Sequence, residues 1–237
     1  MQPLTENNLS NSADDKLLNK IGAFSALGVG IGYIFIMIFY GFAGGKTPDG
    51  GEASLKYLTG KTTFWWAIIW LSILTDILYL PVAFSLKKLF KSFNKVAVLL
   101  ATTLFGLFVV LELVITWSNY SVLMTLSGSY NATTTEAQKT LYITIAEYIS
   151  RHLTSPVLAF YAIFIPSLGV LIFSLVMLKA NFGKITSYAG ILSGIIGMVS
   201  VVGGLFNETL SSLIIPGSIL ALVWFLLVGT KLLILSK

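Results

Sequence analysis

The 237-residue sequence contains no cysteine and a single histidine, His152. Without cysteine the chain has no disulfide, no thiolate nucleophile, no iron–sulfur cluster and no cysteine-ligated zinc. One histidine excludes intrachain bis-histidine haem and multi-histidine metal sites. The sequence also contains no phosphate-cradling glycine loop, no nucleophile elbow and no H-E-x-x-H motif. We therefore predict no cofactor, no metal and no evident catalytic residue, and we favour a protein that is not an enzyme.

Charged residues are also scarce. They make up 11% of the chain, about half the share usual in a soluble domain, while apolar residues make up 56% and the mean hydropathy is +0.87. Six separate apolar runs are near or above the ~20 residues that a helix needs to cross a bilayer. We therefore predict an all-α, polytopic membrane protein, a single transmembrane domain built as a bundle of six helices. The helices are expected at about 21–43, 63–86, 96–117, 154–178, 185–205 and 213–235.

Polar segments separate these runs. Residues 1–20 are predicted to be a polar tail, and the glycine-rich stretch 44–61 is predicted to be a loop. Residues 118–153 are expected to form a long outer loop. Within it, Thr133 and Glu136 have the spacing of a capping box, which could begin a helix lying on the membrane surface. In the fourth run, the interior Pro166 is expected to break or bend the helix.

The basic residues predict which way the bundle crosses the membrane. Four lysines lie within the nine residues 87–95, between the second and third runs. Cytoplasmic loops carry an excess of Lys and Arg, so this hairpin is placed inside, which puts ten basic residues on the inner side and five on the outer side. The inner set is Lys16, Lys20, Lys87, Lys88, Lys91, Lys95, Lys179, Lys184, Lys231 and Lys237, and the outer set is Lys46, Lys56, Lys61, Lys139 and Arg151.

This orientation puts both termini in the cytoplasm and the six spans in the cell membrane, with the lipid bilayer as the first partner. The net charge of +5 is then explained by orientation and by contact with anionic headgroups. We therefore expect no nucleic-acid partner. A homo-oligomer or a membrane-protein partner is compatible with the sequence.

Asp76 lies about halfway along the second run. A charge at that depth costs at least ~2.5–3.5 kcal/mol, so the carboxyl group is expected to face the bundle interior. Ser72 and Tyr79 share its helical face at i−4 and i+3 and offer local hydrogen bonds. Two interpretations remain open. Asp76 either locks helix packing as a buried polar residue or, with these neighbours, binds a proton, a cation or a polar ligand.

A second carboxylate, Glu112, lies near the outer end of the third run. Either it forms an interfacial ion pair with Arg151 or His152 that fastens the outer loop, or it joins Asp76 in a ligand or ion site. Glu147 and Arg151 are one turn apart, so Glu147, Arg151 and His152 are a candidate ion-pair cluster on the outer side.

Glycine and serine recur on one face of the fifth run, at Gly190, Ser193, Gly194 and Gly197. Small residues let neighbouring helix backbones approach closely within a membrane. We therefore predict that this face packs tightly inside the bundle.

These features favour a multi-pass membrane protein that binds or passes a small ligand, or that is a subunit of a larger membrane assembly. One alternative is a membrane-embedded enzyme that uses Asp76 and Glu112 as acid and base, which requires both carboxylates in one water-accessible cavity. A second alternative is a small membrane sensor or regulator that exposes its outer loop.

Several stretches also carry a likeness to known sequences. They are Asp76-Ile-Leu-Tyr-Leu, Leu86-Lys-Lys-Leu-Phe, Leu111-Glu112-Leu, Phe182-Gly-Lys-Ile-Thr-Ser-Tyr-Ala-Gly-Ile and Leu222-Val-Trp-Phe-Leu-Leu-Val-Gly-Thr-Lys. Together they resemble an uncharacterised family of six-helix prokaryotic integral membrane proteins, a domain of unknown function. The resemblance implies the six-helix fold and a prokaryotic cell membrane, with Asp76 and Glu112 at the family's polar positions. It implies no activity.

Overall fold

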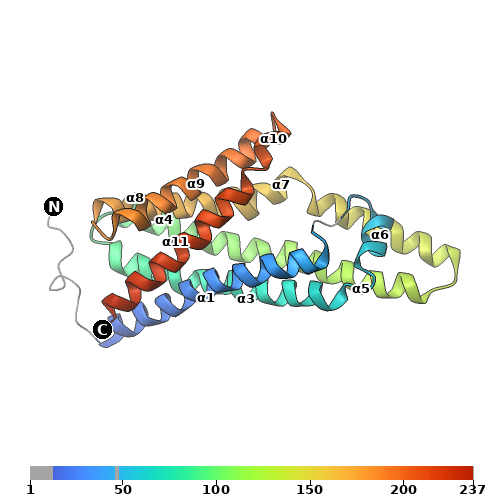
Figure 1. Ribbon diagram of the computed structural model, residues 1–237, viewed down its shortest axis with the longest axis horizontal. Helices are drawn as coiled ribbons and strands as arrows, with labels where there is room; N and C mark the ends of the chain where they lie inside the picture. Colours follow the sequence, from blue (N-terminus) through green and yellow to red (C-terminus); the bar gives the residue numbers. More distant parts are fainter. Residues whose placement is uncertain (1–12, 46–47, 237) are drawn as a thin grey trace.

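The computed structural model describes residues 13–45 and 48–236, and these residues form helices and short turns without a strand (Figure 1). Six helical segments are long and apolar enough to cross a membrane, which confirms the predicted fold class. Three are single helices: α1 (Ala13–Ala43), α3 (Thr62–Phe90) and α9 (Lys184–Gly204). The other three are composite: α4 (Lys95–Leu111), η2 (Glu112–Trp117) and α5 (Ser118–Ala132); α7 (Pro156–Ala159), η3 (Phe160–Phe164) and α8 (Ile165–Lys179); and α10 (Glu208–Ser211) with α11 (Ile214–Leu235).

The first and last described helices begin and end at the same end of the bundle (Figure 1, left). There Lys88 near the end of α3 forms an ion pair with Asp15 in the first turn of α1, with 2.9 Å between Nζ and Oδ1. One turn further along α1, Asn19 Oδ1 accepts a hydrogen bond from Ser85 Oγ at 3.1 Å. This end therefore holds the α3–α4 hairpin and its lysines. That this end faces the cytoplasm stays a prediction, and Lys46 and Lys237 lie outside the described residues.

Two polar segments that were predicted to be irregular are helical. Ser118–Ala132 continues the third span as α5, and the expected loop at 44–61 contains α2 (Gly51–Leu58). The predicted polar tail also differs, since residues from Ala13 onward already belong to α1, while residues 1–12 lie outside the description. The two loop predictions were wrong because polar side chains of α5 find partners on α2 and on Thr59, which directly follows it. Ser127 Oγ, for example, donates to the Leu55 carbonyl at 2.8 Å.

A second helix outside the spans, α6 (Glu136–Leu153), packs against α2 and α5. Its long direction follows that of the bundle, and α5 and α6 extend past the other helices (Figure 1, right). The predicted helix is therefore present, but it does not lie flat across the end of the bundle. We refer to α2, α5 and α6 as the cap, whose separate apolar core includes Leu55, Leu58, Trp65, Leu123 and Ala146.

The two interior prolines have different surroundings. Helix α3 continues through Pro81, whereas Pro166 is the second residue of α8, the helix that directly follows the π-helix η3. Proline has no amide hydrogen and its ring conflicts with the carbonyl four residues earlier. The wider π-helical turn accommodates both constraints, so the predicted disturbance at Pro166 takes this form.

The small-residue face of α9 packs as predicted. A Cβ atom added at Gly194 would lie 2.7 Å from the Ser167 carbonyl oxygen of α8, and one added at Gly190 would lie 2.4 Å from Trp224 Nε1 of α11. The opposite face, with Tyr188, is exposed. Helix α9 therefore lies at the edge of the bundle, with one face packed and the other facing lipid.

Candidate functional site

The structure brings the two intramembrane carboxylates into one buried region. Asp76 belongs to α3, Glu112 is the first residue of η2, and each is only 4% exposed. The two carboxyl groups interact electrostatically with each other. A shared site was one of several possibilities that the sequence left open, and the packing of η2 on α3 is the reason the two carboxylates meet.

The hydrogen-bond partner of Asp76 comes from another helix. Trp117 Nε1 donates to Asp76 Oδ2 at 2.6 Å. Of the two local residues, Tyr79 bonds elsewhere, because its hydroxyl pairs with the Tyr33 hydroxyl at 2.6 Å. The hydrogen bond that Asp76 makes is therefore not one of the local bonds that Ser72 and Tyr79 offered, because Trp117 at the end of η2 reaches the carboxylate directly.

Glu112 is less completely satisfied. The Thr116 hydroxyl hydrogen-bonds to its carboxyl group and lies 3.1 Å from the Tyr161 hydroxyl. The remaining oxygen, Glu112 Oε1, has no hydrogen-bond partner among the described residues. The predicted ion pair between Glu112 and Arg151 or His152 was wrong, because Arg151 lies in the cap and bonds to Glu147.

Most of the polar residues in this region belong to two π-helices. Glu112, Thr116 and Trp117 all belong to η2, and Tyr161 belongs to η3. The hydroxyl pair of Thr116 and Tyr161 joins the two π-helices directly. Because π-helical turns are rare and are frequent at functional sites, their coincidence with the carboxylates favours this region as a site.

Glu147 forms a separate cluster in the cap. Its Oε2 accepts a hydrogen bond from the Gly51 backbone N–H at 2.6 Å, and its Oε1 accepts from Arg151 Nε at 2.8 Å. The Gly51 amide, and after it Arg151, lowers the pKa of Glu147. The carboxylate thus lies at the N-terminus of α2, where the helix dipole favours negative charge. His152 lies beside the Tyr148 ring and takes no part in the ion pair.

A cavity of about 310 Å³ lies beside the carboxylate region, between α1, η3, α8, α9 and α11. Helices α1 and α11 touch near Gly30 and Leu226, where an added Cβ would lie 2.6 Å from the leucine side chain. Beyond this contact the two helices separate, and the wall of the cavity on the α1 side begins at Tyr33. The cavity is therefore a consequence of the angle between α1 and α11.

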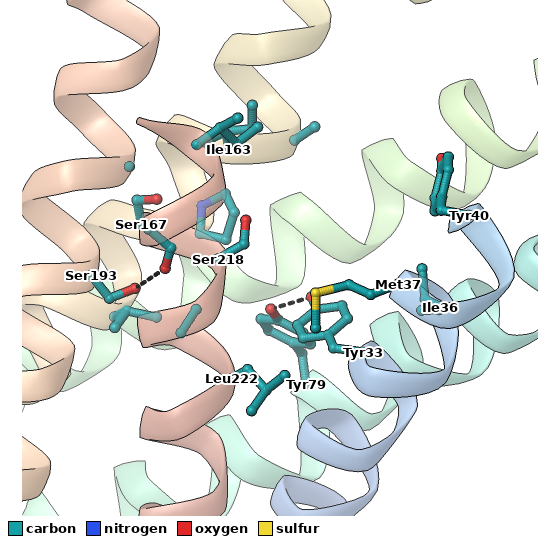
Figure 2. A pocket seen from close by; sticks show the side chains of 17 residues that line it. Tyr33, Ile36, Met37, Tyr40, Tyr79, Ile163, Ser167, Ser193, Ser218 and Leu222 are labelled. Atoms are coloured by element: carbon teal, nitrogen blue, oxygen red, sulfur yellow. Dashed lines mark hydrogen bonds between the residues drawn. The ribbon is translucent and has the colours of Figure 1, made fainter. Parts of the chain in front are cut away.

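The cavity is mainly apolar and has hydroxyl groups on two sides. Ser167, Ser193 and Ser218 lie on one side, and Tyr33 and Tyr79 lie on the other (Figure 2). No Asp, Glu, Lys, Arg or His is among the residues that line it. The lining favours an uncharged occupant with a small number of hydrogen-bonding groups.

Tyr33 and Tyr79 connect the two features. Both line the cavity, and both interact electrostatically with Asp76 and Glu112. Neither Asp76 nor Glu112 is among the lining residues. The carboxylate pair therefore lies behind the tyrosine wall of the cavity.

Several residues of this region were missed in the sequence. Trp117, Tyr33 and Tyr161 are three among 5 tryptophans and 10 tyrosines, and such residues are common near membrane interfaces. The part of the chain that the structure describes contains no group of three or more His, Cys, Asp or Glu side chains arranged to hold a metal ion.

The fold and its six apolar spans define a multi-pass helical membrane protein in contact with the lipid bilayer. A family model described as Domain of unknown function (DUF4386) matches residues 29–234, and the chain belongs to this family. The match extends from the middle of α1 almost to the end of α11 and includes the carboxylates and the cavity. No curated protein matches the chain, and no solved structure does.

Proposed function

We propose that this membrane protein binds a small, uncharged and largely apolar molecule in the cavity between α1, α8, α9 and α11. The observation that carries the proposal is the cavity itself, whose volume of about 310 Å³ is at the lower end of the range for small-molecule sites, roughly 300–1,000 Å³. Its occupant has the size of a short-chain alcohol, ketone or amide.

The hydroxyl groups support a ligand with one or two polar atoms. Ser193 Oγ donates to the Gly217 carbonyl at 3.1 Å, so it is already engaged. Ser167 and Ser218 also line the cavity and carry a donor and acceptor each. A polar ligand atom near these serines and an apolar body along α1 would match the lining.

The bilayer is the source of ligand that fits this site. Met37 lines the cavity and is also 47% exposed on the surface of α1. Within a transmembrane helix, such an exposed apolar side chain faces lipid. The edge of the cavity therefore reaches the lipid-facing surface, and an apolar molecule dissolved in the membrane can enter from there.

An acid–base enzyme is less well supported. That function needs both carboxylates in one accessible cavity with the substrate, and the residues lining this cavity include neither Asp76 nor Glu112. Binding requires only the cavity and its hydroxyl groups.

The test is photoaffinity labelling of the protein in lipid nanodiscs with a short-chain alkanol that carries a diazirine group. We expect saturable labelling of lining residues such as Met37 and Ser218, which unlabelled alkanol should suppress. Ala221→Phe, which places a ring into the cavity, should lower the saturable labelling by about tenfold, equivalent to about 1.4 kcal/mol of binding free energy.

The matched control is Ile219→Phe, which adds a ring two residues away on α11, where the side chain is exposed and does not line the cavity. This variant should label like the wild type. Labelling spread over all lipid-facing helices without saturation, or equal labelling of Ala221→Phe and wild type, would contradict the proposal.

A further inference from the structure

The carboxylate region poses a problem of charge. Asp76 and Glu112 are both buried within spans, and a single unpaired charge at such depth costs several kcal/mol. Two negative charges close together cost more than two separate charges, because they repel each other in a medium of low dielectric constant. A compensating positive species is therefore needed.

No basic side chain supplies it. The Asp76 carboxyl group is affected by its burial and by the hydrogen bond from Trp117. The Glu112 carboxyl group is affected by its burial, by the charge of Asp76 and by the hydrogen bond from Thr116. The titratable residues that face the pair from neighbouring helices are all tyrosines: Tyr33 and Tyr40 of α1, Tyr79 of α3 and Tyr161 of η3. Among the described residues, no lysine, arginine or histidine acts on either carboxylate.

The two carboxyl groups differ in how well their surroundings satisfy a negative charge. Asp76 Oδ2 accepts a short, 2.6 Å hydrogen bond from the Trp117 indole, and a donor of this kind favours the charged form. Glu112 Oε1 is buried and has no partner among the described residues. A protonated carboxyl group needs fewer donors than a carboxylate, because it becomes a donor itself.

The hydrogen bonds around Glu112 have a consistent direction. An ionised or protonated carboxyl oxygen can accept from the Thr116 hydroxyl, and the Thr116 oxygen can in turn accept from the Tyr161 hydroxyl. This arrangement fixes one oxygen of Glu112 through η2 and η3. The other oxygen, Oε1, is left as the atom that can carry a hydrogen.

We propose that Asp76 and Glu112 form a proton-binding site that holds one proton at neutral pH, carried on Glu112, while Asp76 stays ionised against Trp117. The bound proton reduces the charge of the pair from −2 to −1. The site is distinct from the cavity and does not depend on the proposed ligand. It gives the two π-helices a role, since they hold Glu112, Thr116, Trp117 and Tyr161 in this arrangement.

The test is infrared spectroscopy of the protein in lipid bilayers, with the proton as the only ligand. At neutral pH we expect the absorption of one protonated, buried carboxyl group per chain, which shifts in D₂O and is lost at alkaline pH. Glu112→Gln should abolish this absorption. The control Glu208→Gln, which removes an exposed carboxylate at the start of α10, should retain it.

Asp76→Asn supplies a second variant if Glu112→Gln fails to fold. It should retain the absorption in mild acid and lose it at a lower pH than the wild type, because Glu112 still binds the proton but Asp76 no longer repels its charge. Absence of the absorption in mild acid as well would overturn the assignment to Glu112. Absence of a protonated carboxyl group from the wild type at neutral pH would overturn the proposal. Loss of the absorption when Na⁺ replaces choline at fixed pH would also overturn the proposal, because the site would then bind a metal cation.

Discussion

The indole N–H of Trp117 donates a 2.6 Å hydrogen bond to the Asp76 carboxylate, across 41 positions of the sequence. The Trp117 ring also stacks on Tyr120, with ring centroids 5.9 Å apart, and Tyr120 stacks on Trp65. The indole is thus held between the cap and the bundle. Because the Trp117 side chain contacts both, it connects Asp76 in the intramembrane region to the aromatic layer beneath the cap.

Removal of this hydrogen bond is expected to destabilise the protein. Trp117→Phe keeps an aromatic ring but leaves the buried Asp76 carboxylate without its donor. Hydrogen bonds to charged groups contribute about 1.5–3 kcal/mol, so we expect a loss of that order, measured as a lower unfolding temperature in nanodiscs. Trp70→Phe, at a side chain that is 65% exposed on α3, is the control and should change little.

The double variant Asp76→Asn with Trp117→Phe separates the hydrogen bond from ring packing. If the two residues act together, the double variant should lose less stability than the sum of the single variants. Strict additivity would show that Trp117 stabilises the fold through packing alone.

The six spans could be predicted because their signal is local. A run of apolar residues long enough to cross a bilayer restricts the backbone to a helix, whatever its neighbours are. The cap could not be predicted in this way. Ser118–Ala132 is polar enough to suggest a loop, and its polar side chains find partners in a distant part of the chain, such as Thr59 Oγ1, which accepts from Asn131 Nδ2 at 2.6 Å just after α2.

The candidate site was accessible to sequence analysis only in part. Asp76 and Glu112 were identified because charges within apolar runs are rare and expensive. Their surroundings were not, because Trp117 bonds to Asp76 from another helix, through a contact that no local spacing encodes. Tyr161 and Tyr33 likewise bond to the neighbouring Thr116 and Tyr79 from distant parts of the chain. The cavity was also missed, since it depends on the angle at which α1 and α11 separate.

Glu147 should stabilise the cap in a pH-dependent way. Its pKa is lowered in the folded protein from a reference value of 4.5, first by the Gly51 amide and then by Arg151. A lowered pKa means that the folded state binds the proton less well than the unfolded state. The stabilisation is therefore fully present above about pH 4.5 and is lost as the pH falls through the folded value.

Thermal unfolding of Glu147→Gln and wild type across pH tests this expectation. The variant should be less stable at neutral pH, because it loses the charge at the N-terminus of α2, and the difference should shrink in acid. Glu136→Gln, at the exposed start of the same helix, is the control and should show a smaller difference at neutral pH. A deficit in Glu147→Gln that stays constant into acid would contradict a contribution from the charge.

The packed face of α9 should not accept a large side chain. Gly194→Leu would drive its Cβ to within 2.7 Å of both the Ser167 carbonyl and the Leu171 Cβ. Overpacking of this kind typically costs about 1–3 kcal/mol, and we expect a lower unfolding temperature. Gly106→Leu is the control, because a Cβ added at Gly106 meets nothing within 4 Å. Equal behaviour of the two variants would show that α8 and α9 are not closely packed in the membrane.

The orientation of the bundle can be tested with single cysteines, because the natural chain has none. Ser92 lies exposed in the α3–α4 turn, among Lys87, Lys91 and their neighbours, and Thr134 lies exposed at the far tip of the cap. The excess of basic residues at the α3–α4 end predicts that this end is cytoplasmic. In intact cells, an impermeant thiol reagent should therefore label Thr134→Cys, whereas Ser92→Cys should react only after permeabilisation. The reverse labelling pattern would show that the protein has the opposite orientation, with the cap in the cytoplasm.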